Sequence, residues 1–525
     1  MKKKKMLALF LCVAMLLSAC SGGGTETVSG ENDPGGISES DTVTVAVATD
    51  PGSMFPYDYL NSTGRRIFSP VCEPLFIFDE DMVPQPGLAT SVDVAEDGMN
   101  FTLHLREGVL FHNGQEMTAE DVKYSLERCG DSSQRSTMPF IDYENIEVVD
   151  DYTVYVPCTS SCGPIQSHLA VVGYVVCKSA CEENPNYQKE MIGTGPFRFV
   201  SWTNDELITY EANEDYWGEL PSYQNLVIRI IPDASAASSA VLTGEVDINL
   251  NVNNSDVVPI LDGTNTDAFA YVGAPISTRT LIMNCTNEYL SNIQVRQAIA
   301  CAIDRQAVID TAYDGLGELL WSMITPYHNT FNEDLRNNWP YEYDVERAKS
   351  LLAEAGYPDG GFTLTAVLDE TVATRTAMEV IGNMLSQVGI TLEIQQYEST
   401  TYTDVTTNSN DYDIIIDDMN QNGDPANALL MLYDPENGVI GGSNFSRNID
   451  QPNADVFREA LIAATSSVDE QQRINLYAEA QEIAVENVWT IPISATGWYA
   501  IYGKNVEGFW FAGVHPHYEN IQIVG

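Results

Sequence analysis

Apolar and polar residues alternate between positions 100 and 106, which is the two-residue period of a strand with one buried face. The apolar positions are Phe101, Leu103 and Leu105. Glu107-Gly108 then predicts a turn, Val109–His112 a second short strand, and Asn113-Gly114 a tight turn after it. The pattern therefore predicts two strands connected through tight turns.

A helix is expected to follow these strands. Thr118 stands three residues before Asp121, which is the spacing of a capping box. Val122, Ser125 and Leu126 then share one face of the helix. None of these residues is arranged for chemistry, so the pattern alone indicates a structural scaffold.

The second half of the chain alternates helical and strand patterns. The expected elements are a helix from Gln294, a helix from Asp344 to Gly356, a strand at Phe362–Leu368, a helix ending at Gly389, a strand at Ile390–Ile394, and helices around 453–464 and 469–486. A strand, a helix and a strand of these lengths form a βαβ crossover, the unit of a parallel sheet. This part of the chain is therefore predicted to be α/β.

The N-terminus has the pattern of a signal for export. Lys2–Lys5 are basic and Met6–Leu17 are apolar but too few to span a bilayer comfortably. Residues 21–40 are rich in Gly and Ser, so we expect a flexible tether. Leu17-Ser18-Ala19-Cys20 resembles the lipobox of bacterial lipoproteins, which implies that Cys20 carries lipid and becomes the mature N-terminus. The alternative is an ordinary secretory signal.

The charge balance is strongly acidic. The formal net charge is -50, and removal of four signal lysines leaves -50 - 4 = -54. Such a chain repels nucleic acid and anionic lipid, so no nucleic-acid partner is expected. The charge either biases the protein toward cationic or zwitterionic ligands or simply keeps an exported protein soluble.

Eight cysteines lie outside the signal and the lipobox. They are Cys72, Cys129, Cys158, Cys162, Cys177, Cys181, Cys285 and Cys301. Outside the cytoplasm disulfides are possible, and free thiols and a zinc site are the alternatives. The spacings Cys158-x3-Cys162 and Cys177-x3-Cys181 are looser than a zinc ribbon, and no histidine stands at ligand spacing.

Several segments carry specific sequence motifs. The stretch from Asp97 to Arg128, with its F-x-L-x-L-R-x-G-V strand and T-A-E-D-V-x-x-S-L helix start, resembles the family 5 extracellular solute-binding proteins of ABC importers. That family includes dipeptide, oligopeptide and nickel binders. Further landmarks similar to the family's follow in the expected order: GTGPFRFVSW (193–202), ANEDYWG (212–218), LTGEVDI (242–248), VRQAIACAIDR (295–305) and HPHYENI (515–521).

The resemblance implies a two-lobed α/β fold, like that of type II periplasmic binding proteins, with an extra inserted domain and a ligand cleft between hinged lobes. The implied parts are a signal (1–19), a tether (20–40), lobe I (41–71, 192–283 and 498–525), an inserted domain (72–191) and lobe II (284–497).

The segment 411–446 is the most informative one for a binding site. Ile414–Ile416 predicts a central parallel strand, and ligands of open α/β sheets bind where such strands end. Dipeptide-binding members have a G-W-T-G-D-N-G-D-P type loop after a similar strand, and its first acidic residue pairs with the ligand's ammonium. The matching position here is Gln421, which supplies no countercharge. Asp417 or Asp418 could substitute from the strand end.

Weaker candidates complete the predicted ligand site. Asp424 ends the N-G-D-P match, and Phe445 lies in the family's next landmark. Ser53, Met54 and Phe55 lie in the loop after the first strand, which in the family lies against the ligand. Arg279 is the best candidate for a ligand carboxylate, although it also fits a surface charge. The aromatic residues Trp202, Trp217 and Trp498 could line a pocket, but large aromatic residues at strand ends are more often part of the core.

Two histidines are relevant to the alternative that the protein binds nickel. His515 and His517 alternate on one side of a strand and fit either a metal site or a structural strand. We expect no metal and no cofactor.

Hydrolase motifs such as G-x-S-x-G and H-E-x-x-H are absent from the sequence, so we expect a binding protein and not an enzyme. The predicted function is a monomeric, lipid-anchored receptor at the cell surface or in the periplasm. It captures a peptide or peptide-like solute by hinge closure and delivers it to an ABC permease. A non-peptide ligand, such as a nickel chelate or an oligosaccharide, is the alternative, and a sensor or adhesion lipoprotein is a further one.

Overall fold

The computed structural model describes residues 41–58, 62–409, 411–421, 424–425, 429, 452–513 and 515–524. These residues belong to one compact unit, Ser40–Gly525. No helix in these ranges is long and apolar enough to cross a membrane.

The alternating segment forms strand β5 (Asn100–Leu105), whose apolar side chains are all buried. Helix α2 (Ala119–Gly130) follows, and the Asp121 carboxylate accepts a hydrogen bond from the Thr118 N–H at 3.0 Å. The predicted second strand is wrong. Leu110 makes only an isolated bridge to Glu116, because the turn at Gly114 (φ 82°) returns the chain after too few residues for a ladder.

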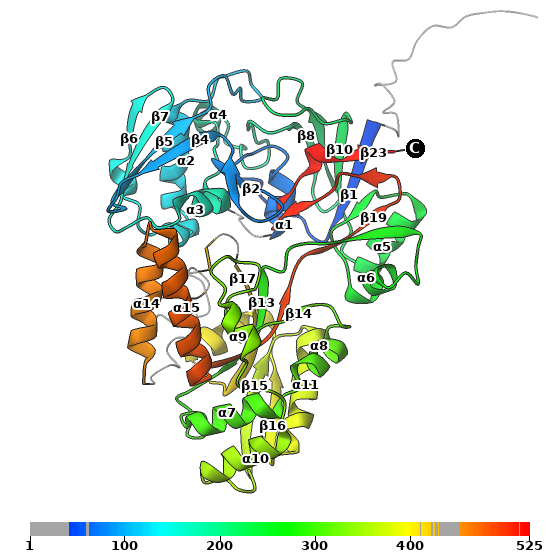
Figure 1. The fold of residues 1–525 in the computed structure, drawn as a ribbon. Helices are drawn as coiled ribbons and strands as arrows, with labels where there is room; N and C mark the ends of the chain where they lie inside the picture. Colours follow the sequence, from blue (N-terminus) through cyan, green and yellow to red (C-terminus); the bar gives the residue numbers. More distant parts are fainter. Residues whose placement is uncertain are drawn as a thin grey trace, which may run out of the picture. The chain divides into compact units, whose positions relative to one another are not determined.

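Lobe I contains a mixed sheet that three separated parts of the chain build together (Figure 1). Its order in the described residues is β12 (Ala268–Val272), β19 (Tyr499–Gly503), β11 (Ile248–Asn249), β1 (Thr42–Val47), β10 (Asn225–Ile230), β9 (Leu207–Ala212) and β8 (Phe197–Thr203). Alternation along β1 explains its two faces, because Val43, Val45 and Val47 enter one core while Ala46 enters a second. The second core is covered by α5 (Ala234–Thr243) and α6 (Asn254–Leu261).

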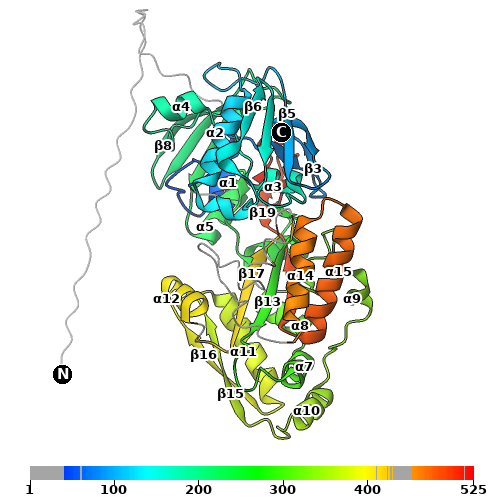
Figure 2. The same ribbon diagram turned by 90° about the vertical axis from the view of Figure 1, so that its left-hand side faces the viewer.

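Lobe II has a sheet between two layers of helices (Figures 1 and 2). The order of its described strands is β14 (Glu318–Leu319), β18 (Thr490–Thr496), β13 (Ser277–Met283), β17 (Ile414–Asn420), β15 (Phe362–Leu368) and β16 (Ile390–Gln396). The predicted parallel βαβ unit is confirmed as β15, α11 (Val372–Ser386) and β16. Ile414 and Ile416 face one core and Ile415 the other, so the sheet is buried on both faces.

The helices of lobe II divide between these two faces. One core is built with α7 (Ile293–Ala302), α8 (Arg305–Ala312), α10 (Val345–Glu354) and α11. The other core includes α14 (Ala454–Ser466) and α15 (Glu470–Asn487), which lie side by side in both views (Figures 1 and 2). The short helices α9 (Glu333–Asn337) and α12 (Ser399–Asp404) complete the described part of this lobe.

Two sequence expectations about this lobe are corrected by the strand pairing. The proposed boundary at 283/284 would place β13 in lobe I, but β13 pairs with β17 and β18 in the sheet of lobe II. The strand predicted at Ile414–Ile416 runs on to Asn420, and its long pairing, with β13, is antiparallel. It is parallel to β15 only at Ala366 and Ile414. The continuous apolar run correctly predicted a strand that is buried on both faces, but burial does not determine the direction of a strand.

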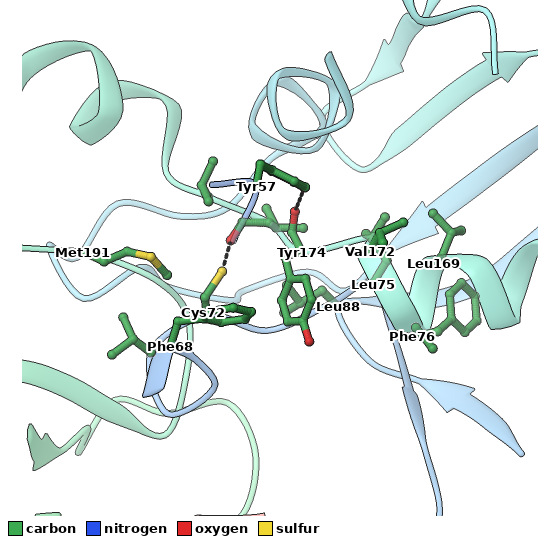
Figure 3. Close-up of a cluster of buried hydrophobic side chains, with 14 of the residues drawn as sticks. Tyr57, Phe68, Cys72, Leu75, Phe76, Leu88, Leu169, Val172, Tyr174 and Met191 are labelled. Carbon is green, nitrogen blue, oxygen red and sulfur yellow. Dashed lines mark hydrogen bonds between the residues drawn. The ribbon is translucent and has the colours of Figure 1, made fainter. Parts of the chain in front are cut away.

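The inserted segment carries its own sheet and yet shares the core of lobe I. Its described strands are β4 (Ala89–Val94), β5, β7 (Thr153–Pro157) and β6 (Glu147–Asp150), with the pair β2 (Phe76–Phe78) and β3 (Pro84–Pro86) and the helices α3 (Ile165–Val172) and α4 (Lys178–Glu183). One continuous cluster of buried side chains joins these elements to β1 and to α1 (Ser62–Phe68). Figure 3 shows its centre, where the Tyr57 hydroxyl donates to the Tyr174 carbonyl and the Cys72 thiol to the Val175 carbonyl at 3.2 Å. The segment is therefore an extension of lobe I rather than an independent core.

The chain ends in lobe I with short described strands: β20 (Val506–Glu507) with β23 (Gln522–Ile523), and β21 (Phe511–Ala512) with β22 (His515–Pro516). The eight cysteines of the described residues are all free thiols. The disulfides that were considered possible from the sequence are therefore not formed in this structure. Burial raises the pKa of the Cys72 and Cys129 thiols.

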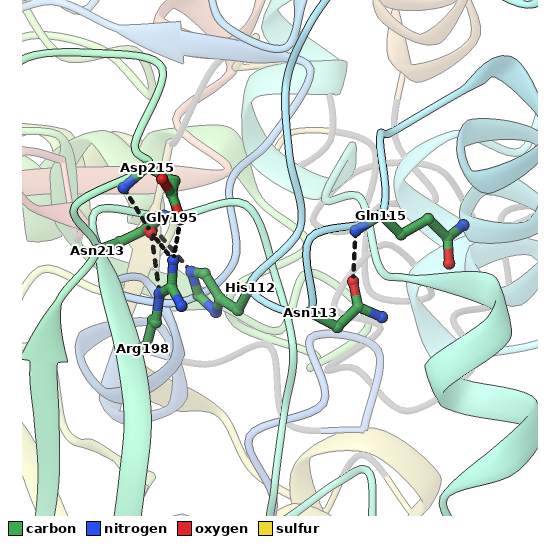
Figure 4. A network of polar contacts seen from close by, with 7 residues as sticks. All are labelled: His112, Asn113, Gln115, Gly195, Arg198, Asn213 and Asp215. Carbon is green, nitrogen blue, oxygen red and sulfur yellow. Dashed lines mark hydrogen bonds and ion pairs between the residues drawn. The ribbon is translucent and has the colours of Figure 1, made fainter.

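Several sequence landmarks meet in one polar network (Figure 4). The His112 imidazole lies 3.0 Å from the Gly195 carbonyl oxygen, and the Asn213 amide donates to the same oxygen at 3.0 Å. Arg198 donates to Asn213 at 2.7 Å and to Asp215 at 2.8 Å. The segment around His112 and the landmarks at 193–202 and 212–218 are thus mutual structural anchors of lobe I.

A second network centres on the carboxyl group of Glu73. It accepts hydrogen bonds from the Thr194 hydroxyl (2.7 Å), the Tyr216 hydroxyl (2.7 Å) and the Trp217 indole (2.9 Å). Burial raises the pKa of Glu73 to about 7, against the opposing effect of these donors. Trp217 is therefore a structural anchor, in agreement with its interpretation as a core residue.

Glu73 should make stability depend on pH. Because the pKa of Glu73 is higher in the folded protein, the folded protein keeps a proton on Glu73 between pH 4.5 and about 7, whereas the unfolded chain has lost it. The stability that this proton contributes is fully present below pH 4.5 and is lost as the pH rises to about 7. Relative to the wild type, Glu73→Gln should gain about 2–3 kcal/mol of unfolding free energy between about pH 5 and about pH 8. Urea unfolding at several pH values checks this result.

The control for Glu73→Gln is Glu211→Gln, at an exposed position of β9. Because Glu211 is exposed, this substitution should change the free energy of unfolding by no more than about 0.5 kcal/mol. A difference for Glu73→Gln that does not change with pH would contradict the prediction, because it would show that the folded protein holds Glu73 ionised between about pH 5 and about pH 8.

Candidate ligand-binding site

Charged residues gather at the carboxyl end of the central strand β17. Arg279 on β13 stands opposite Asp418 on β17 in the antiparallel register, and its Nε lies 3.1 Å from Asp418 Oδ2. The Arg279 guanidinium also covers the Tyr313 ring at 3.9 Å. The Asp418 side chain is 48% exposed, so the pair joins opposite charges at a position that a solute can reach.

Asp417 lies beside this pair and points to the other face of the strand. Burial raises the pKa of its carboxyl to about 7, and the charge of Asp418 adds to the shift. Asp417 is therefore partly protonated at neutral pH. Burial raises the pKa of the Asp418 carboxyl as well, but there the charge and hydrogen bond of Arg279 oppose the shift.

A cleft of about 490 Å³ opens beside the residues that follow β17. Its walls come from the inserted segment, including Met82 and Gln166, and from lobe II, including Tyr327, Asp424 and Arg473. Of the residues singled out from the sequence, Asp424 lines this cleft. The Asp418 and Arg279 pair and the loop residues 53–55 do not.

Asp424 is fixed from two sides by helix α15. Its side chain is 4% exposed, its Oδ1 accepts a hydrogen bond from the Tyr477 hydroxyl, and its Oδ2 lies 3.8 Å from Arg473 Nε. His168 is buried nearby and His328 is partly buried, and desolvation lowers the pKa of both imidazoles, so both are neutral at neutral pH. Arg473 and Tyr477 were not found from the sequence. The available signal was their i, i+4 spacing, which places both on one face of a helix.

Gln421 has a different role from the one expected. Its side-chain oxygen accepts from the Thr325 N–H at 3.1 Å, and its side-chain nitrogen donates to the Met323 carbonyl. The side chain is 2% exposed, so its amide fastens the segment 323–325 rather than facing a solute.

The loop after β1 is mostly part of the core. Met54 is fully buried, and Phe55 packs edge-on against Tyr57 and Tyr187. Ser53 donates to Asp58 at 3.1 Å. Trp202 likewise donates to Asp50 at 2.8 Å, which favours its structural interpretation.

The two late histidines make structural contacts. His517 stacks on Trp510 at 3.9 Å and lies 2.7 Å from Glu519, and His515 lies 3.4 Å from the Tyr174 hydroxyl. No group of His, Cys, Asp and Glu in the described ranges has the arrangement of a metal site. Phe445, predicted to contact the ligand, and Cys20, predicted to carry lipid, lie outside the described residues.

Two α/β lobes joined by two connections, with a charged site where a central strand ends, define the class of two-lobed solute-binding proteins. The model of the bacterial extracellular solute-binding proteins, family 5 Middle, matches residues 83–439. The chain belongs to this family, which confirms the sequence resemblance and the predicted fold class. It is therefore an extracytoplasmic solute-binding protein of an ABC importer and not an enzyme.

Three similar proteins span nearly the same length. Heme-binding protein A of Haemophilus influenzae is 27% identical over 541 residues, with 97% of each chain covered. The dipeptide-binding protein of Escherichia coli is 27% identical over 473 residues, covering 83% of this chain and 86% of its own. The solved structure of the periplasmic binding protein DppA from Helicobacter pylori in complex with the peptide STSA has a TM-score of 0.74 and 26% identity. That alignment covers 92% of this chain and 98% of that one.

Proposed function

We propose that this chain is a monomeric, lipid-anchored receptor that captures peptides or peptide-like solutes and presents them to its permease. The observation that carries the proposal is the pair of Asp418 and Arg279 near the end of β17, in which the Asp418 side chain is 48% exposed and the Arg279 side chain 17% exposed. A short peptide is a zwitterion, and one carboxylate beside one guanidinium offers a partner for each of its charges. The likeness to relatives named for dipeptide and peptide binding supports the same class.

The roles of the two side chains follow from their contacts. Arg279 engages Asp418 through Nε, at Oδ2. Asp418 Oδ1 is then the acceptor for a ligand ammonium, and the outer nitrogens of Arg279 are donors for a carboxylate. The Tyr313 ring fixes the plane of the guanidinium, so little side-chain freedom is lost on binding.

Hinge closure is the proposed mechanism. The lobes are connected by the segments before β13 and after β18, which lie against each other: the Gly273 N–H donates to the Trp498 carbonyl at 2.8 Å. A Cβ at Gly497 would stand 2.0 Å from the Gly273 oxygen, so only glycine fits there. Two short connections in close contact suit a rotation of one lobe against the other. We propose that Cys20 carries the lipid anchor.

Native mass spectrometry of the protein, purified without refolding, tests the ligand class. We expect a ladder of peptide masses that is lost on mild denaturation. Asp418→Asn should retain less of it and should bind trialanine at least tenfold more weakly by calorimetry, which is about 1.4 kcal/mol. Glu379→Gln, on the exposed side of α11, is the matched control and should bind as the wild type does. A single non-peptide mass would instead show a receptor for another small solute.

A further inference from the structure

Arg66 of helix α1 is a buried cation with an unused hydrogen-bonding edge. The residue is 7% exposed, and its Nη1 donates to the Leu250 carbonyl at 2.8 Å. Its Nε and Nη2 are closed off from solvent and have no hydrogen-bond partner among the described residues. In a planar guanidinium the Nε–H and one Nη2–H point the same way, and together they form the edge that binds a carboxylate with two parallel hydrogen bonds.

No acidic side chain of the described residues pairs with this guanidinium, although the chain as a whole carries a large excess of acidic groups. Burial lowers the pKa of Arg66 to about 10, so it remains a cation at neutral pH. A buried charge without a counterion is costly, and unpaired buried donors add to the cost.

Two other buried arginines of the described residues, Arg296 and Arg305, do not share this state. Arg296 is 1% exposed and donates through Nε, Nη1 and Nη2 to carbonyl oxygens. Arg305 is as buried as Arg66, and its Nη1 donates to two carbonyls while its guanidinium covers the rings of Trp321 and Trp339. Among the described residues, Arg473 also has an unpartnered Nε, but it lies 3.8 Å from the Asp424 carboxylate, and only Arg66 has both Nε and Nη2 buried without a partner.

A third unpartnered donor belongs to the ring beneath Arg66. The guanidinium carbon lies 4.8 Å from the centre of the Trp498 ring, and the Trp498 indole nitrogen is also buried without a hydrogen-bond partner. Trp498 stands between β18 and β19, on one of the two connections between the lobes. Leu250, which holds the other side of Arg66, directly follows strand β11. These groups thus lie where the parallel strands β1 and β11 end, the edge at which α/β sheets bind ligands.

We propose that Arg66 and Trp498 form a binding site for a small monoanion of the carboxylate class, next to the connection between the lobes. The anion supplies the missing countercharge and accepts from the Nε and Nη2 of Arg66. Because these donors are covered, the anion enters when the Trp498 segment moves, so occupancy of the site depends on the hinge.

The anion has two possible sources. It is either a free anion of the medium or the carboxylate of the transported ligand. The second source rests on the proposed peptide function and would make Arg66, in place of Arg279, the partner of the ligand's carboxylate.

Anion-dependent thermal unfolding tests the site on the purified protein. Sodium acetate and sodium chloride are titrated separately into the wild type and into Arg66→Met, Trp498→Phe and Arg305→Met. Acetate should raise the unfolding midpoint of the wild type and of the Arg305→Met control, while Arg66→Met should show no such dependence. Each tenfold rise in acetate above its Kd should correspond to about 1.4 kcal/mol of added stability.

Trp498→Phe keeps the ring and removes the indole N–H, so it should weaken acetate binding severalfold. If Arg66→Met does not fold, the acetate dependence of Trp498→Phe alone tests the proposed anion site. The same acetate dependence in the wild type, Arg66→Met and Trp498→Phe overturns the proposal, and a larger response to chloride than to acetate overturns the carboxylate class.

Calorimetry with trialanine and its C-terminal amide separates the two sources. A loss of at least tenfold for the amide, seen in the wild type and absent in Arg66→Met, assigns the site to the ligand's carboxylate. An acetate effect with equal binding of both peptides assigns it to a free anion. If trialanine does not bind, the proposed peptide function fails, while the acetate titration still decides the anion site.

Discussion

Asp424→Ala is expected to lower the free energy of unfolding by about 3–5 kcal/mol, because it leaves a largely buried guanidinium without its countercharge. The carboxylate it removes is 4% exposed and the Arg473 side chain 14% exposed. The Tyr477 hydroxyl, on a fully buried residue, loses its acceptor in the same step. Urea unfolding followed by circular dichroism measures the loss.

A second variant separates the ion pair from the packing of the site. In Asp424→Ala with Arg473→Met the uncompensated charge is gone, so the double variant should be more stable than the sum of the two single losses predicts. Glu379→Ala removes a pair whose side chains are 45% and 54% exposed, and it should cost no more than about 0.5 kcal/mol. Strict additivity of the two buried substitutions would show that Asp424 and Arg473 do not interact.

The sequence predicted well those features that depend on neighbouring residues. Asp344 was identified as a helix start, and its side chain accepts a hydrogen bond from the N–H three residues later. The strand at Phe362–Leu368 was placed with its observed bounds, because an apolar run between turn residues is a local signal.

The candidate site was less predictable, because the role of each of its residues depends on contacts with residues that are distant in sequence. Gln421 was assigned to the ligand from its position in a loop pattern, but its amide bonds backbone groups 96 and 98 residues away. The pairing of Asp418 with Arg279 spans 139 residues and follows from the antiparallel register of β13 and β17, which the apolar pattern leaves undetermined. The sequence offered both charged residues as candidates, but it gave no reason to place them together.

Arg296→Met is the other substitution with a large expected effect, a loss of about 3–5 kcal/mol of unfolding free energy. Arg296 donates to the carbonyls of Leu290 (2.7 Å) and Ser291 (3.2 Å), before α7. It also donates to those of Asn487 (2.7 Å) and Val488 (3.1 Å), at the end of α15. Methionine fills similar space but leaves these acceptors unpaired.

The conservative variant distinguishes hydrogen bonding from charge at this position. Arg296→Lys keeps the positive charge but replaces a planar fork with a single ammonium, which cannot reach carbonyls on both sides, so it should also lose most of the stability. Arg347→Met, at an exposed position of α10, should cost no more than about 1 kcal/mol. Urea unfolding of the three variants compares them directly, and equal small losses would show that the four carbonyls find other donors. The expected large loss would mean that Arg296 holds the turn at Val488 (φ 49°), from which β18 leads to Trp498 and the connection between the lobes.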